Sequence, residues 1–524
     1  MRSSVAAAVV LAIGCSAPHR TLTLAPVPGC PPAGAVNTVR VTAQGDFPPE
    51  ATLTAAASPS APASLALPRA TRAVVVEGFG PTGLAAFGRT PTLSLAALPA
   101  GPLAVAYGPP DGVCLTGALK VARAGHHATA LAGGGVLITG GVDVGDGPAT
   151  QVELYDPRTA TFALTSSSID ARAVLLHAGA ALDDGGALIA GGVGVANGAA
   201  AGIAFAGATR FDERGQPVGS ARLLVGGPRA GHSATLLADG RVLLAGGCQE
   251  LAAGACVGGA VASSTEIYDP AADAFAAGPP LLHGRWGHDA VLRGDGTVLI
   301  VGGRGDSGGA VPAEIVDPDE QRGFDAGVVS GSAAGLPTGS ALVVGGTTTG
   351  DTTVSLWLSS AEASLPLPPL ARPRLGPTLT PLDDGAVLIA GGGDATLALF
   401  DGRAAVGALA ASFSVRDQAA VRLGDGTVLL TGGVDGGGAA SDGAALFFHS
   451  PLSPWASLPP LTLDGPSDPY LPRRPDRASA GGGQLVVAAA APASDGRPAE
   501  LALVAGMQVA DFTFDLLAGR RGDA

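Results

Sequence analysis

The segment Val242-Leu243-Leu244-Ala245-Gly246-Gly247, residues 242–247, places four consecutive apolar residues before a glycine doublet. The pattern occurs seven times, with 41 to 56 residues between successive first glycines. Four apolar residues in a row indicate a short strand buried on both faces, and paired glycines allow positive φ and close backbone approach. A recurrence at this interval predicts a repeat architecture. The doublets are Gly140-Gly141, Gly191-Gly192, Gly246-Gly247, Gly302-Gly303, Gly345-Gly346, Gly391-Gly392 and Gly432-Gly433.

Each doublet is flanked by the same features. In four units a histidine stands ten residues before the first apolar position, and the alternating residues between them predict a second strand. An aromatic-Asp pair such as Tyr155-Asp156, and a large residue about seven positions later, complete a unit of four short strands. One such sheet cannot bury both of its faces alone, so radial stacking into a ring is expected. The histidines are His126, His177, His232 and His288.

The doublets, the aromatic-Asp pairs and the later aromatic residue resemble the kelch repeat. The resemblance covers residues 115–524 and implies an all-β fold, a kelch-type β-propeller of about eight four-stranded modules. The later aromatic is usually Phe rather than the family's Trp, and the fifth and eighth units match poorly. The eighth unit, at residues 484–489, leaves both seven and eight blades open.

Residues 31–114 lack the repeat. Residues 36–41 alternate apolar and polar side chains, and residues 73–76 and 102–107 also read as strands. Pro-rich turns separate these strands, and the low-complexity residues 55–64 are expected to form a loop. We predict a small β-sandwich-like domain over residues 31–114.

The amino terminus carries a targeting pattern. Residues 5–13 are apolar and follow Arg2, which is typical of a signal peptide and too short for a membrane span. The end of this segment, at Cys15, resembles a bacterial lipobox, although Ala12 replaces the usual Leu. The resemblance implies a signal peptide over residues 1–14, a lipid on Cys15, a tether over residues 15–30 and export to the outer membrane or cell surface. Ordinary cleavage nearby is the alternative.

Four cysteines remain once Cys15 is assigned to the lipid. An even number in an oxidising compartment predicts disulfides, for which three pairings exist. We predict Cys30–Cys114 and Cys248–Cys256, with four free thiols as the alternative. Neither pair has the spacing of a zinc site.

Composition limits the partners. The net charge is −14, and no Lys/Arg cluster occurs, which argues against nucleic acid. The expected partner is a protein or glycan, and membrane contact is expected through the lipid anchor only. Aspartates in the loops after the doublets, such as Asp143 and Asp435, fit either turns or calcium, but no EF-hand spacing is present.

The search for catalytic groups favours structure over chemistry. The histidines could converge on a metal, but their recurrence in register predicts hydrogen bonding between blades instead. Copper oxidases resembling galactose oxidase share such a propeller and need a Cys-Tyr cross-link. The tyrosines at 155 and 268 occupy repeat positions, so we expect no metal and no cofactor.

Loops of unequal length after the doublets are the remaining clue. The longest begins at Cys248 and contains the predicted disulfide, which favours recognition because a fixed loop loses less entropy on binding. We therefore expect a non-catalytic binding or scaffold protein rather than an enzyme. The alternative is an exported carbohydrate-active enzyme, such as a sugar epimerase or mutarotase, that uses the axial pocket.

Overall fold

The repeats form antiparallel β-sheets. The computed structural model describes residues 19–45, 54–57, 63–67, 70–92, 102–326, 331–337, 339–345, 352–358, 363–400, 405–410, 416–450, 473–474, 487–489 and 501–503. Within them the chain is all-β, with one short 3₁₀ turn, η2 (Ala171–Ala173). No helix among these residues is long and apolar enough to cross a membrane.

The described residues between 112 and 448 contain seven sheets of four strands. In six of them, neighbouring strands follow one another in the order of the sequence. We number the sheets in the order in which their first strands occur in the chain. Sheet 1 has β9 (His127–Ala130), β10 (Val136–Thr139), β11 (Gln151–Asp156) and β12 (Thr161–Ser168); sheet 2 has β13 (Ala178–Ala181), β14 (Ala187–Ala190), β18 (Gly207–Phe211) and β19 (Pro217–Leu223); sheet 3 has β20 (Ser233–Leu236), β21 (Val242–Ala245), β24 (Thr265–Asp269) and β25 (Ala274–Ala277). Sheet 4 has β26 (Trp286–Leu292), β27 (Val298–Arg304), β28 (Glu314–Asp317) and β29 (Arg322–Asp325); sheet 5 has β30 (Ser332–Gly335), β31 (Ala341–Val344), β32 (Val354–Leu358) and β33 (Ala363–Leu367); sheet 6 has β34 (Thr378–Pro381), β35 (Val387–Ala390), β36 (Thr396–Phe400) and β37 (Ala405–Ala410).

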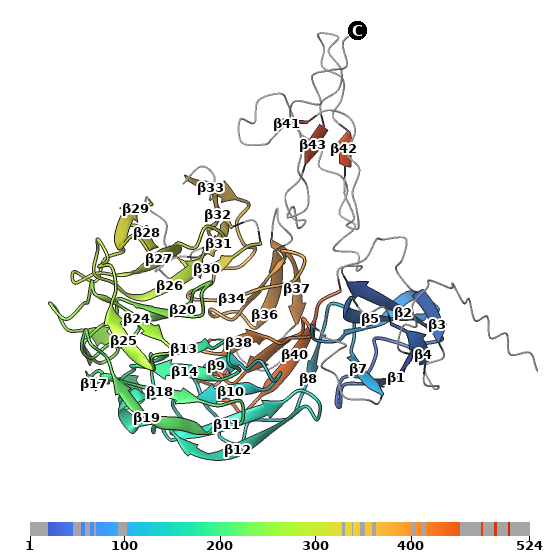
Figure 1. Cartoon of the computed structure of the whole chain (residues 1–524), viewed down its shortest axis with the longest axis horizontal. Helices are drawn as coiled ribbons and strands as arrows, with labels where there is room; N and C mark the ends of the chain where they lie inside the picture. The colour runs from blue at the N-terminus through green and yellow to red at the C-terminus, as the bar shows by residue number, and fades with distance from the viewer. Residues whose placement is uncertain are drawn as a thin grey trace, which may run out of the picture.

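Sheet 7 combines distant parts of the chain. Its first three strands are β38 (Ala419–Arg422), β39 (Val428–Thr431) and β40 (Ala444–Phe448), and its fourth is β8 (Gly112–Leu115). β8 pairs antiparallel to β40, with Val113 opposite Phe447. The first strands of the seven sheets contact one another in chain order, and β38 contacts β9 in turn. Figure 1 shows the sheets following one another around a common centre, an arrangement compatible with a β-propeller.

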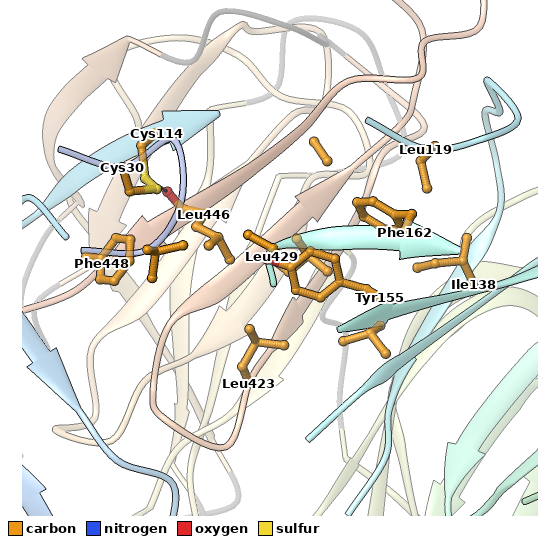
Figure 2. Close-up of a cluster of buried hydrophobic side chains, with 14 residues drawn as sticks. Cys30, Cys114, Leu119, Ile138, Tyr155, Phe162, Leu423, Leu429, Leu446 and Phe448 are labelled. Atoms are coloured by element: carbon orange, nitrogen blue, oxygen red, sulfur yellow. Dashed lines mark hydrogen bonds between the residues drawn. A yellow bond between two sulfur atoms is a disulfide. The ribbon is translucent and has the colours of Figure 1, made fainter. Parts of the chain in front are cut away.

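The four residues before the doublet are buried in the second strand of each sheet, as the four-residue apolar pattern predicts. Its side chains pack between neighbouring sheets. One cluster joins Leu243 and Ile267 of sheet 3 to Val298 and Ile300 of sheet 4. Another joins sheet 7 to sheet 1 and includes Tyr155, as Figure 2 shows. Each sheet therefore buries both faces against its neighbours.

The glycine doublets form the joints between sheets. Gly246 has φ +63°, and a Cβ there would lie 2.5 Å from the carbonyl oxygen of Arg285 in the next sheet. The N–H of Gly247 donates to that same oxygen at 2.8 Å. The equivalent bonds run from Gly141 to Val174 and from Gly433 to Arg123. Glycine is required at the first position because the next sheet occupies the space of a side chain.

The amino-terminal strands form two further sheets. One has β4 (Ala63–Ala66), β1 (His19–Pro26) and β7 (Leu103–Tyr107), and the other has β3 (Thr54–Ala57), β2 (Thr38–Gly45), β5 (Thr71–Gly80) and β6 (Gly83–Arg89). Leu22, Val41, Val74 and Val105 share one buried cluster between them.

Two expected boundaries differ from the structure. The tether expected at residues 15–30 contains β1, whose Thr21-Leu22-Thr23-Leu24 alternation suits a strand with one buried face. The small domain expected to end at residue 114 does not include β8, because that strand completes sheet 7.

The expected eighth repeat unit lies mostly outside the described residues. Its last residues belong to β42 (Val487–Ala489), which forms a three-stranded sheet with β41 (Arg473–Arg474) and β43 (Leu501–Leu503). Cys15 and the expected signal peptide also lie outside the described residues.

Candidate functional site

Both predicted disulfides are present, Cys30–Cys114 and Cys248–Cys256. Cys114 lies on β8, so the first bond ties the strand that completes sheet 7 to the amino-terminal segment. Figure 2 shows this bond beside Phe448 and Leu446 of the same core. Two disulfides are consistent with an extracellular protein.

The repeat histidines lie at the boundaries between sheets. His126 Nε2 lies 2.8 Å from Thr431 Oγ1 of sheet 7, and His177 Nε2 lies 2.9 Å from Thr139 Oγ1 of sheet 1. His288 Nε2 lies 3.0 Å from Ser233 Oγ of sheet 3. His232 occupies the same position, but neither ring nitrogen has a partner among the described residues.

Burial keeps these histidines neutral. Burial lowers the pKa of His177 and of His288 to about 3, and it places the pKa of His126 well below the ordinary value. Neutral, buried imidazoles that bridge neighbouring sheets perform a structural task.

The arginine three residues before each of three histidines has a role that the sequence did not indicate. The Arg285 guanidinium donates to the carbonyl of Gly302 at 3.0 Å and to Glu314 Oε1 at 2.6 Å, and both charged side chains are fully buried. Arg123 with Glu153, and Arg229 with Glu266, repeat the arrangement. These ion pairs could have been recognised in the sequence by the Glu near the start of the third strand of each of the three sheets.

The loops after the doublets of sheets 2 and 3 join at one end of the ring. The first contains the hairpin β15 (Val195–Ala196) and β16 (Ala199–Ala200), followed by β17 (Gly202–Ile203). β17 pairs with β22 (Glu250–Ala252), which pairs with β23 (Ala255–Cys256), so the Cys248–Cys256 bond closes a small three-stranded sheet. We call this end of the ring the doublet end.

Trp286 lies at the doublet end beside this small sheet. It is the first residue of β26, is partly exposed, and packs against the cluster that contains Cys248 and Leu251. β26 and its partner β27 have seven residues each, whereas the first two strands of the other six sheets have four. Sheet 4 therefore extends an aromatic side chain to the doublet end.

Asp289 lies three residues further along β26. It follows His288, and the backbone N–H of Ala333 in sheet 5 donates to its Oδ2 at 2.9 Å. The side chain is partly exposed. Burial raises the pKa of Asp289 to about 6, and the bond from Ala333 opposes this shift. A partly exposed carboxyl that titrates near neutral pH can accept and return a proton.

His127 occupies the same position of β9 in sheet 1. Its Nδ1 lies 3.1 Å from Thr129 Oγ1, and its ring centroid lies 6.0 Å from that of His177. Burial lowers its pKa to about 4, so the partly exposed ring is neutral at pH 7. Sequence analysis singled out the neighbouring histidines and missed both Asp289 and His127.

The aspartates in the loops that follow the glycine doublets stabilise turns by accepting backbone hydrogen bonds. Asp143 Oδ1 accepts from the N–H groups of Gly145 and Gly147 at 2.8 and 3.0 Å. Asp435 does the same for Gly437 and Ala439. Within the described residues, no group of three His, Cys, Asp or Glu side chains is arranged to hold a metal.

Solved structures resemble this chain. No protein-family model and no curated protein matches the chain. One of the solved structures is a fungal alcohol oxidase of the AA5 family in complex with copper, with 16% identity, 64% of this chain and 75% of that chain covered, and a TM-score of 0.47. The expectation of a non-catalytic binding or scaffold protein is corrected here: this solved structure is that of an oxidase.

The side chains of this chain do not fit a Cys-Tyr copper centre in the described part. Cys30, Cys114, Cys248 and Cys256 are all in disulfides. Tyr155 and Tyr268 are buried against Phe162 and Phe275, with ring centroids 4.7 and 4.9 Å apart. We therefore derive no step through copper.

Proposed function

We propose that this protein is an exported carbohydrate-active enzyme that performs acid–base chemistry on a sugar, as an epimerase or mutarotase does. We further propose that its seven sheets are the blades of a kelch-type β-propeller, closed by β8. The circuit of contacts among the seven first strands supports a ring, and the pairing of β8 with β40 supports its closure. The reacting sugar would lie at the doublet end of the ring axis.

Asp289 is the observation that carries this proposal. It lies on a first strand, it is partly exposed, and one of its oxygens accepts from the backbone N–H of Ala333. In register, it faces Val301 as Ser233 faces Ala245 in sheet 3. A carboxyl thus replaces a small hydroxyl at a position around the axis. Its pKa of about 6 is close to the value that favours proton transfer near neutral pH.

Trp286 supports a sugar as the ligand. Its ring is partly exposed on the same strand as Asp289 and at the doublet end. Indole faces present an apolar surface to the C–H groups of a sugar, while the polar groups nearby meet its hydroxyls.

The proposed chemistry needs one proton removed and one supplied. In anomer interconversion, a base takes the proton of the anomeric hydroxyl while an acid protonates the ring oxygen, and the bond between C1 and that oxygen breaks. Rotation and the reverse transfers re-form the ring with the other anomer. Asp289, ionised above about pH 6, serves as the base. The neutral His127 ring, on another first strand, offers an N–H as a hydrogen-bond donor to the ring oxygen, and the proton that this oxygen takes up comes from solvent.

Polarimetry tests the proposal. Purified protein should accelerate the mutarotation of freshly dissolved α-D-glucose or α-D-galactose, with a rate that rises as the pH passes through about 6. Asp289→Asn should lower the catalysed rate at least about 100-fold. The matched control, Asp146→Asn in an exposed loop, should not. An unchanged rate in Asp289→Asn would contradict the role of this carboxyl.

We also propose that residues 1–14 are a signal peptide and that Cys15 carries the lipid anchor. The nine apolar residues before the cysteine support this proposal. Cys15→Ala should release the protein from the membrane fraction, and unchanged membrane association would count against the anchor.

A further inference from the structure

Six residues of left-handed backbone surround the doublet end of the ring axis. Each stands one position before the repeat histidine or its replacement, and their φ values lie between +55° and +67°. The equivalent residue of sheet 5 lies outside the described residues. The six are Gly125, Leu176, Gly231, Gly287, Gly376 and Asp417.

Backbone hydrogen bonds join these residues from sheet to sheet. The N–H of Gly125 donates to the carbonyl of Asp417 at 2.8 Å. The N–H of Gly231 donates to Leu176, and that of Gly287 donates to Gly231, both at 2.7 Å. We call this arrangement the mouth ring. These three bonds hold the backbone of five of the six residues against a neighbouring sheet.

Glycine takes this conformation without strain, and four of the six positions have it. Leu176 carries a Cβ that disfavours left-handed backbone, whereas Asp417 is of a residue type that adopts it more readily. Leu176 has a packing reason, because it lies partly buried against the cluster that contains Trp286. An exposed charged side chain at a position where four other sheets have glycine is not required by packing.

Asp417 is that position. Its side chain is 59% exposed, and its ionic contact is with the adjacent Arg416, with Nε 3.9 Å from Oδ2 and an equally exposed side chain. Such a contact contributes little to folding. The backbone of Arg416 is held in place by a bridge to Val434. Sheet 7 therefore presents a carboxylate and a guanidinium at the mouth ring.

We propose that Asp417 contacts the ligand and selects for sugars with two adjacent free hydroxyls; this inference rests on the proposed function. A carboxylate accepts from two hydroxyl donors at once, and the guanidinium of Arg416 donates to hydroxyl oxygens beside it. Trp286 lies beside another member of the mouth ring, where its Cε3 would lie 3.2 Å from a Cβ on Gly231. Charged pair and aromatic ring together suit a ligand with one polar and one apolar face.

The test uses the full mature chain with D-glucose, D-galactose and 2-deoxy-D-glucose, which lacks one of the adjacent hydroxyls. Calorimetry measures binding, and thermal unfolding measures stability. Asp417→Gly should bind glucose and galactose at least tenfold more weakly without a lower melting temperature. Wild type should bind 2-deoxy-D-glucose more weakly than glucose, and Asp417→Gly should lose this preference.

Asp146→Gly is the matched control, because Asp146 is also exposed and left-handed, with φ +57°. It should leave binding unchanged. Wild-type affinity in Asp417→Gly overturns the inference, and so does a melting temperature lowered by several degrees, which would make the side chain structural. If polarimetry shows turnover by wild type and by Asp417→Gly alike, this inference fails and the proposed function stands. If wild type neither binds nor converts these sugars, both fail.

Discussion

Gly246→Ala tests whether the glycine doublets are the joints between sheets. The residue has φ +63°, and a Cβ there would lie 2.5 Å from the Arg285 carbonyl oxygen and 2.9 Å from His288 Cε1. The oxygen cannot move away freely, because it accepts the bond from Gly247, and Arg285 is anchored to Gly302 and Glu314. A methyl group therefore forces sheets 3 and 4 apart.

Two contributions set the size of the effect. Left-handed backbone costs an alanine about 1–2 kcal/mol. Insertion of a methyl group into a packed joint costs about 1–3 kcal/mol more. We expect Gly246→Ala to lower the free energy of unfolding by about 2–5 kcal/mol.

Gly254→Ala separates the two contributions. Gly254 has φ +78°, and a Cβ there meets nothing within 4 Å. It should lose only the conformational part, about 1–2 kcal/mol. Equilibrium unfolding in urea, followed by far-UV circular dichroism, measures both variants against wild type. Equal losses in the two variants would refute the joint.

Two further predictions concern buried histidines. Ala190→Thr should supply His232 with the hydroxyl partner that the equivalent histidines have, and should raise the free energy of unfolding by about 1 kcal/mol. Ala190→Val has the same shape without the hydroxyl and should not raise it. An equal gain in both variants would exclude the hydrogen bond. His449 lies between Asp111 and Asp384, with Nδ1 and Nε2 at 3.0 and 2.6 Å from their carboxylates. Burial opposes charge there, but the two carboxylates prevail and raise the pKa of His449 to about 9. Because the folded pKa is the higher one, the stabilisation is complete below the unfolded value of 6.5 and is lost as the pH rises through about 9. The urea midpoint should therefore fall between pH 7 and 9.5 in wild type and fall less in His449→Gln; parallel curves would contradict the assignment.

Local signals accounted for the second strands and for the disulfides. Four apolar residues before a doublet identify a buried strand because the pattern itself specifies burial on both faces. Cys248 and Cys256 could be paired because the short loop between them leaves little alternative. Cys30 and Cys114 could be paired with each other because they enclose the segment before the first repeat.

The pairing of strands that lie far apart in the chain was not predicted from the sequence. β8 completes sheet 7 through contacts with β40, more than 300 residues away, and its Gly112-Val113-Cys114-Leu115 sequence has no feature of the repeat. Its place depends on pairing with a strand far along the chain, which no local pattern encodes. The buried pair of Arg285 and Glu314 was missed for a related reason, because a charged residue normally indicates exposure unless its partner is known.

The candidate site is found by comparing the repeats with one another. Residues that recur in register, such as His288, have a structural reason to recur, so they direct attention away from function. Asp289 and Asp417 are departures from the repeat: five of the other sheets have a small or hydroxyl side chain at the position of Asp289, and four sheets have glycine at the position of Asp417. Packing within a repeat restricts only the size and polarity of the side chain at each position. A carboxyl at a position where packing accepts serine or glycine is therefore not explained by the fold, and this is the physical ground for placing the chemistry at the doublet end.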